Sequence, residues 1–196
     1  MKKFFFVLWV ICSMACRENT EPKTIVSGME ADTAVNFFPV TEYVLGQIKI
    51  LKSTPINPLK ITSVGNTIDS VWLKREEIEQ EMQLFLTPEI DSTNLMPYYN
   101  QSRFLDQTLN RVTLSYDLQA QPQSNYPWKR WDVYINPKTG EVTLLYMVKQ
   151  PDPDNEVQLS WQAGRYCQML YLNRAPGDKM EVVKKTVIQW DFEDEL

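Results

Sequence analysis

The chain of 196 residues contains no histidine and only three cysteines. Histidine supplies the base of Ser–His and Cys–His catalytic sites and is the commonest protein ligand of metals, so the ordinary forms of these sites are excluded. Nothing else in the sequence indicates a metal or another cofactor. We therefore expect a protein without a cofactor, and the balance leans toward one that is not an enzyme.

Long hydrophobic runs are also missing, apart from a short one near the N-terminus. Residues 4–11 are eight apolar residues, which as a helix would span about 12 Å and cannot cross a hydrocarbon core of ~30 Å. Lys2 and Lys3 precede this run, and the short sequence Ser13-Met14-Ala15 follows it. This order is typical of a secretory signal peptide, so we expect residues 1–15 to be removed from the mature protein.

Cys16 directly follows the expected signal. The sequence Ser13-Met14-Ala15-Cys16 resembles the lipobox of bacterial lipoproteins, with Ser13 where the usual motif has leucine. The resemblance implies that the Cys16 thiolate accepts a diacylglyceryl group and further acyl chains such as palmitate; an ordinary signal cleaved nearby is the alternative. Cys12 lies inside the signal, so Cys167 is left without a partner for an internal disulfide. Its apolar surroundings in the sequence predict a buried residue.

Positive charge is scarce. The chain has 20 Lys and Arg residues against 25 Asp and Glu residues, for a net charge of −5, and the signal removes two lysines and no acidic residue. An acidic chain is repelled by phosphate backbones and by anionic lipid surfaces. We expect no nucleic-acid partner.

The mature chain is long enough for one domain. Residues 16–36 are polar and aperiodic, which predicts the acylated cysteine followed by a flexible tether. Residues 37–192 hold the patterned segments and predict a globular domain, and residues 193–196 form an acidic tail. The tail, Glu193 to Leu196, resembles an endoplasmic-reticulum retention signal with an acidic residue in place of the basic one, but the lipobox favours a bacterial chain.

Two amphipathic helices are expected in the first half of the domain, and a third is weaker. The first follows Phe37-Phe38-Pro39 and ends at Ser53; its apolar stripe is Val40, Val44, Ile48 and Leu51. The second covers residues 74–86, with the stripe Ile78, Met82, Phe85 and Leu86. The third runs from about Tyr99 to Leu109.

Short alternating segments separated by turn residues predict strands elsewhere. The expected strands are residues 59–64, 67–73, 111–118, 129–135, 141–150, 156–163, 166–173 and 180–190. Connections such as Gly65-Asn66 and Asn136–Gly140 are too short for parallel crossovers, so the strands should form an antiparallel meander. The predicted fold class is α+β: a single domain with a sheet of about 6–8 strands, with strong curvature as one version, covered by two to three N-terminal helices.

Two of these strands are apolar on both faces. Leu145 and Met147 lie opposite Leu144 and Tyr146, and the strand at 166–173 repeats the pattern. One face must receive the helices, and the other needs a cover, because large apolar patches are uncommon on monomers. We expect this cover to come from the first hairpin or from curvature that closes the sheet on itself. A ligand or a partner is the alternative.

Aromatic residues gather near one strand, at Tyr126, Trp128, Trp131 and Tyr134, with Lys129 and Arg130 between them. Such a cluster suits a sugar ring, a peptide or a lipid headgroup, and we take it as the candidate ligand-binding site. Packing at the sheet edge is the competing and more ordinary interpretation. Asp132 lies within the cluster and is the candidate acid or base of a hydrolytic site, although no second carboxylate is placed beside it.

The layout of lipobox, polar tether, acidic helix and closing strands resembles the small outer-membrane lipoproteins of the Bacteroidota. The resemblance implies a bacterial outer-membrane protein, held to the membrane by its N-terminal lipid anchor, in a leaflet that stays open. Our first hypothesis is a non-enzymatic envelope lipoprotein that binds an apolar ligand or an envelope protein. The alternatives are a carbohydrate-active or other hydrolytic enzyme that uses Asp132, and a structural subunit of an envelope assembly.

Overall fold

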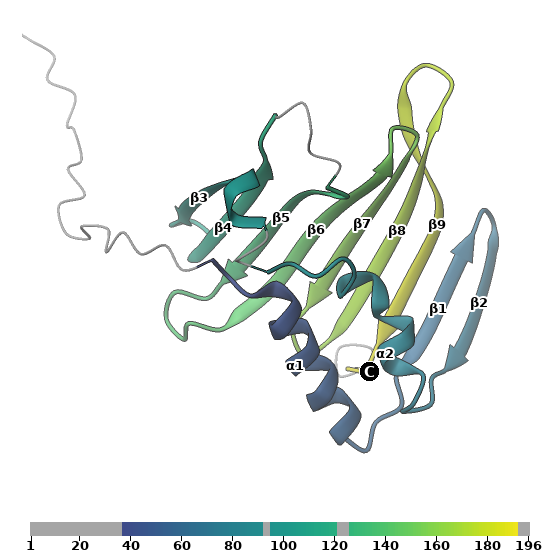
Figure 1. The fold of residues 1–196 in the computed structure, drawn as a ribbon. Helices are drawn as coiled ribbons and strands as arrows, with labels where there is room; N and C mark the ends of the chain where they lie inside the picture. The colour runs from purple at the N-terminus through teal and green to yellow at the C-terminus, as the bar shows by residue number, and fades with distance from the viewer. Residues whose placement is uncertain (1–36, 92–94, 121–125, 192–196) are drawn as a thin grey trace, which may run out of the picture. The chain divides into compact units, whose positions relative to one another are not determined.

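The computed structural model describes residues 37–91, 95–120 and 126–191, and Cys16, the tether and the acidic tail lie outside these ranges. The described chain forms one antiparallel sheet of nine strands in the order β2-β1-β9-β8-β7-β6-β5-β4-β3 (Figure 1). The strands are β1 (Leu59–Val64), β2 (Thr67–Trp72), β3 (Tyr99–Asp106), β4 (Arg111–Leu118), β5 (Trp128–Ile135), β6 (Val142–Asp152), β7 (Asn155–Gln162), β8 (Tyr166–Ala175) and β9 (Lys179–Gln189).

The meander is confirmed for β3 to β9, each of which pairs with the next along the chain. Tight turns make this possible: Gly140 and Gly164 have φ values of +74° and +77°, in the left-handed region that glycine adopts at little cost. The expectation of six to eight strands was too low, because Tyr99–Asp106, expected as a helix, is a ninth strand, β3; the β1–β2 hairpin joins the same sheet beside β9. The sheet is open, with β2 and β3 as its two edges.

Helix α1 (Val40–Ser53) confirms the first expected helix and its stripe. Val40, Val44, Ile48 and Leu51 are all buried, since residues at this spacing share one helix face. Pro39 stands at the N-cap, where its missing N–H has no intrahelical partner to lose. At the other end, the Thr54 hydroxyl donates a hydrogen bond of 2.7 Å to the Leu51 carbonyl.

The second expected helix is much shorter than its sequence pattern. Only α2 (Ile78–Glu81) is α-helical, and a 3₁₀ turn, η1 (Gln83–Phe85), follows it. Ile78, Met82 and Phe85 are nevertheless buried as the spacing predicted. The described residues are therefore mostly β structure, and the α+β class holds only in part.

The third expected helix is wrong, because Tyr99–Asp106 is strand β3, preceded by a 3₁₀ turn, η2 (Met96–Tyr98). All eight residues of β3 pair with β4, so this strand forms without any helical stripe. The turn that joins them has a clear chemical signal. The Asp106 carboxylate accepts hydrogen bonds from the N–H groups of Thr108 and Leu109, and Asn110 has a φ of +48°.

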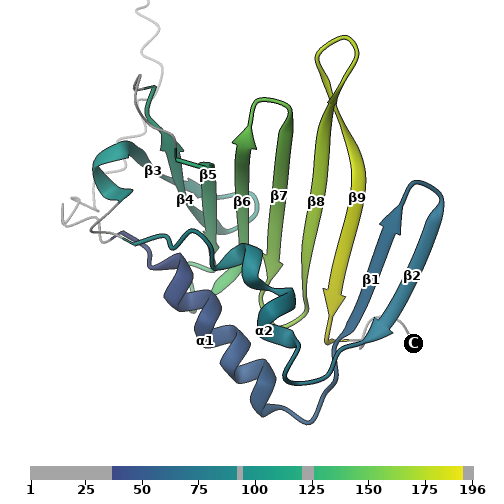
Figure 2. The ribbon, with the colours of Figure 1, turned by 45° about the vertical axis from the view of Figure 1, so that its right-hand side comes forward.

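The hydrophobic core lies between one face of the sheet and the helices α1 and α2, which Figure 2 shows on the same side of it. Its largest fully buried side chains include Trp128, Trp131, Trp161, Tyr116, Phe85 and Met147. Phe85 meets Trp161 edge to face at 5.4 Å, and Tyr116 stacks on Trp131 at 5.1 Å. The face that carries Leu145, Met147 and Met169 is thus packed shut.

The opposite face carries no helix in the described part of the chain. The first hairpin, expected as a cover, extends the sheet in its own plane instead. No described helix has both the length and the apolar content to span a bilayer.

Candidate functional site

The side of the sheet opposite α1 and α2 is the candidate site, and we call it the open face. Side chains alternate along a strand, and directly paired residues share a face. Register therefore places Asp132, Tyr146, Ser160, Gln168 and Val187 in one row across β5 to β9. The neighbouring rows add Arg130, Val148, Gln158, Leu170 and Lys185 on one side, and Tyr134, Leu144, Gln162, Tyr166 and Gln189 on the other.

An ion pair lies in the β5 part of this face. The Arg130 guanidinium donates two hydrogen bonds to the Asp132 carboxylate, Nε to Oδ2 at 3.0 Å and Nη2 to Oδ1 at 3.2 Å. The Asp132 side chain is only 2% exposed, whereas that of Arg130 is 48% exposed. A carboxylate that is out of water needs such paired donors. The hydrogen bonds to Asp132 also raise the pKa of Arg130.

The charged groups around this pair are of both signs. Asp117 approaches the Arg130 Nε at 3.8 Å from β4, and Lys129 approaches Glu156 at 3.8 Å. A depression of about 660 Å³ lies here on the open face, and Tyr146 and Gln158 also line it. It offers both signs of charge, a phenol and an amide, which is the chemistry of a polar recognition surface.

Two tyrosines next to the ion pair are partly withdrawn from water. Burial raises the pKa of Tyr146, and the neighbouring Glu156 carboxylate adds to the effect. Burial also raises the pKa of Tyr134, and Asp132 adds to it. The Arg111 guanidinium lies over the Tyr134 ring at 4.4 Å from its centre. Both phenols therefore stay protonated and able to donate hydrogen bonds at neutral pH.

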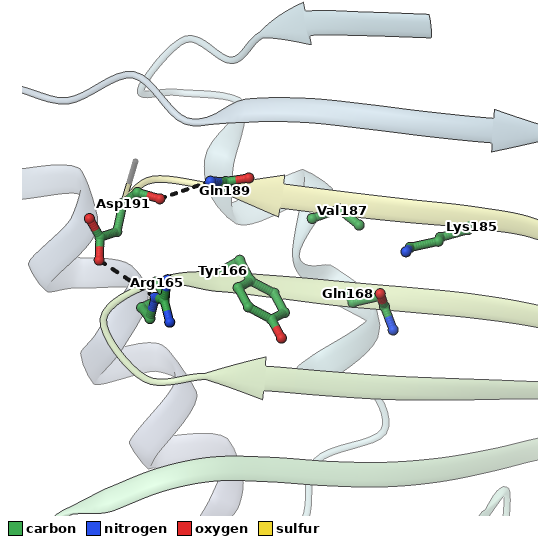
Figure 3. A pocket seen from close by; sticks show the side chains of 7 residues that line it. All are labelled: Arg165, Tyr166, Gln168, Lys185, Val187, Gln189 and Asp191. Carbon is green, nitrogen blue, oxygen red and sulfur yellow. Dashed lines mark hydrogen bonds and ion pairs between the residues drawn. The ribbon is translucent and has the colours of Figure 1, made fainter. Parts of the chain in front are cut away.

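A second depression, of about 330 Å³, lies on the open face between β8 and β9. Figure 3 shows Tyr166 and Gln168 from β8 beside Lys185 and Val187 from β9, with the Arg165–Asp191 ion pair of 3.7 Å at one end. Aromatic, amide and cationic groups thus recur at both depressions, so the open face has a similar chemistry along its width.

The four aromatic residues expected to bind a ligand do not share one surface. Trp128 and Trp131 are fully buried in the core, and Trp128 donates its indole N–H to the Pro88 carbonyl at 2.9 Å. Tyr126 contacts Tyr98 ring to ring at 4.6 Å, whereas Tyr134 lies on the open face. A side chain without exposed surface cannot stack on a ligand, so packing accounts for the two tryptophans. A ligand site at this cluster stays a prediction, and the placement of its members argues against it.

The remaining residues considered in the sequence have structural positions. Cys167 is fully buried, as predicted. Asp152 accepts hydrogen bonds from the N–H groups of Asp154 and Asn155, which is a polar turn. Within the described residues, no group of three or more Cys, Asp or Glu side chains is placed to hold a metal ion. Cys16 lies outside them.

Comparison of the chain with protein-family models, with curated proteins and with solved structures found no match.

The sequence indicated Arg130 as a cation among aromatic residues, but its pairing with Asp132 was missed. The signal was present, because residues i and i+2 of a strand point to the same face. The glutamines at 158, 162 and 168 were missed as well. They alternate with apolar residues, and only the position of the helices shows that their side of the sheet is the uncovered one.

Proposed function

We propose that the protein is a lipid-anchored protein of the bacterial cell envelope that binds a partner protein through its open face. The anchor is supported by the signal and by Cys16 in the sequence. The binding role is supported by the difference between the two faces of the sheet, and this difference is the observation on which the proposal depends.

The helix-covered side favours a partner over an apolar ligand. Met147, Leu159 and Trp161 have no exposed surface, and α1 and α2 lie against them. An apolar ligand would have to displace these side chains from a core packed as closely as a crystal. Because side chains fill this side of the sheet, it is a poor candidate for an apolar-ligand site.

The chemistry of the open face fits a protein partner. Protein interfaces are enriched in Tyr and Arg and depleted in Lys and Glu, and their energetic centres follow the same preference. Tyr134, Tyr146, Tyr166 and Arg130 all lie on this face. The intervening Gln and Ser residues make it more polar than the faces that hold permanent assemblies together. A partner that associates and dissociates therefore fits better than a structural subunit role.

The hydrolytic alternative has less support. Both oxygens of the Asp132 carboxylate accept hydrogen bonds from Arg130, and the side chain is almost completely buried. A general base must reach a substrate proton or a water within about 3 Å. In this arrangement Asp132 holds Arg130 in place on the surface, which is a structural contribution.

The binding role can be tested by placing a photo-crosslinking amino acid at Tyr146 in living cells. We expect a discrete adduct with one envelope protein, because Tyr146 lies near the centre of the open face. The matched control places the same amino acid at Ile50, which is 59% exposed on α1 and should give no such adduct. Leu170→Arg introduces a charge on the open face two strands away from Tyr146 and should remove the adduct, whereas Ile50→Arg should leave it. Equal adducts from positions 146 and 50, or none from either, would contradict the proposal.

The anchor has its own test. Mass spectrometry of the mature N-terminus should show Cys16 as the first residue, carrying a diacylglyceryl group. An unmodified Cys16, or cleavage at another residue, ends the lipoprotein part of the proposal and leaves the binding part standing.

A further inference from the structure

Strand β2 is an edge strand with little of the usual protection, since Asp69 is its one charged residue. All six of its residues, Thr67 to Trp72, are exposed, and Ile68 and Trp72 are exposed by 71% and 58%. Natural sheets protect their edges with proline, lysine or β-bulges. The strand contains no proline or lysine, and its register with β1 is unbroken. Such an edge is a ready template for another strand.

The backbone geometry shows which residues offer their polar groups to the free edge. In antiparallel pairs, residues alternate between those bonded to the neighbour and those directed away from it. Leu73 donates its N–H to the Pro58 carbonyl at 2.8 Å, so the odd-numbered residues of β2 face β1. The Ser70 N–H instead meets the carboxylate of Asp69 at 2.9 Å. Ile68 and Ser70 therefore direct their backbone to the free edge.

The sequence of β2 is complementary to itself in one register. If two copies pair antiparallel about a two-fold axis at Ser70, Ile68 lies opposite Trp72 on the open face, and Asp69 lies opposite Val71. The adjacent register about Asp69 would place two carboxylates directly opposite each other, which is destabilising. The strand's one charge thus disfavours the register about Asp69, and the register about Ser70 is favoured because it pairs the strand's two largest side chains, Ile68 and Trp72.

We propose that β2 is a dimerisation edge, where a second copy of this chain pairs antiparallel about Ser70 and continues the sheet. A two-fold pairing closes on itself, so it ends at a dimer rather than a filament. In the single chain, the Asp69 carboxylate accepts the hydrogen bond from the Ser70 N–H. On pairing, a backbone carbonyl of the second copy accepts this hydrogen bond instead. The Asp69 carboxylate therefore opposes pairing and sets its strength.

Disulfide trapping tests both the pairing and its register. Two Ser70 residues at the axis form a hydrogen-bonded pair with a Cα–Cα distance of about 5.5 Å, which lies within the range that a disulfide spans. Ser70→Cys in the full chain, in detergent and under a mild oxidant, should give a covalent dimer. Ile68→Cys is the matched control, because its two copies would be about 14 Å apart and should stay unlinked. The wild-type chain, with its own cysteines, gives the background.

Two further variants measure the pairing without a disulfide. The wild-type chain should reach twice its single-chain mass in light scattering as its concentration rises. Ser70→Pro removes the N–H at the axis and should stay at the single mass, while circular dichroism shows that the sheet is kept. Asp69→Ala frees that N–H and should lower the dimer Kd roughly three- to tenfold. A single mass at all concentrations, equal cross-linking at positions 68 and 70, or a disulfide from the Ser70→Cys variant to a different protein overturns the proposal.

Discussion

The carboxylate of Asp132 lies on a face that no described helix covers, yet it is almost fully buried. Arg130 covers it with two hydrogen bonds, and its register neighbours Ser115 and Tyr146 lie on either side. The Asp132 carboxylate is thus shielded from water by Arg130, and in return it fixes the Arg130 side chain at the surface. The exposed guanidinium is then held in place, so it would lose little side-chain freedom in binding the proposed partner.

Replacing this carboxylate should cost stability. We expect Asp132→Asn to lower the free energy of unfolding by about 1–3 kcal/mol, because it weakens two charge-assisted hydrogen bonds in a buried position. Asp117→Asn is the matched control: its side chain is 52% exposed and 3.8 Å from Arg130, so its loss should stay below about 1 kcal/mol. Urea denaturation of both variants measures the difference. Equal losses would show that Asp132 is no more important than a surface charge.

Elements differ in how well the sequence predicted them. The hairpins after Arg111 followed from alternation and from turns such as Asn136–Gly140, because both signals are local. The helix at 74–86 had the right buried residues but the wrong length, since its apolar spacing also suits one helical turn followed by a 3₁₀ turn. The sequence wrongly predicts a helix at strand β3, because the stability of this strand comes from pairing with β4 and its own pattern shows no period.

The open face was the harder part to predict, because it depends on contacts between distant segments. Alternation showed that β6 and β8 have two apolar faces, but it does not say which face the helices take. The position of α1 decides this, and it is fixed by contacts such as the hydrogen bond from the Ile90 N–H to the Thr41 hydroxyl, 2.8 Å long. The ion pair of Lys52 with Glu79, at 2.9 Å, joins α1 to α2 in the same way.

The buried stripe of helix α1 should supply most of the stability that this helix gives to the fold. We expect Ile48→Ala to lower the free energy of unfolding by about 2–5 kcal/mol, because it opens a cavity beneath the helix. Ile50→Ala in the same helix makes the identical change at an exposed position and should stay within about 0.5 kcal/mol. Thermal unfolding of the pair gives the comparison. A large loss at position 50 would mean that this side of α1 is also covered.

At the scale of the whole molecule, many tyrosines share one direction of pKa shift. Burial raises the pKa of Tyr43, Tyr99, Tyr116, Tyr134, Tyr146 and Tyr171 above the usual value of 10.0. In the unfolded chain these phenols lose their protons near pH 10, before the folded chain does. Stability from this source is therefore complete below pH 10 and falls as the pH rises further.

The expected result is a melting temperature that drops between pH 9.5 and 11.5 but not between pH 8 and 9. Burial lowers the pKa of Lys149, so this one group makes stability rise with pH. Its effect is opposed by that of the six tyrosines. Tyr99→Phe removes one contributor, although it also loses the hydrogen bond of 2.6 Å to the Trp128 carbonyl. Its melting temperature should be lower at pH 8 and fall less steeply above pH 10. A flat profile for the wild-type chain would contradict this account.

The place of β1 between β2 and β9 has a consequence for the order of folding. Lys60 pairs with Ile188, so about 125 residues of chain separate the two strands. Strands β3 to β8 can add to one another as each is synthesised, but the β1–β2 hairpin has no other neighbour and is only marginally stable alone. Pairing across such a separation is slow, because the entropy of a long loop is lost before any contact is gained. The first strands to be made are therefore the last to join the sheet, and a chain cut short before Lys179 would leave both β1 and β8 with an unpaired edge.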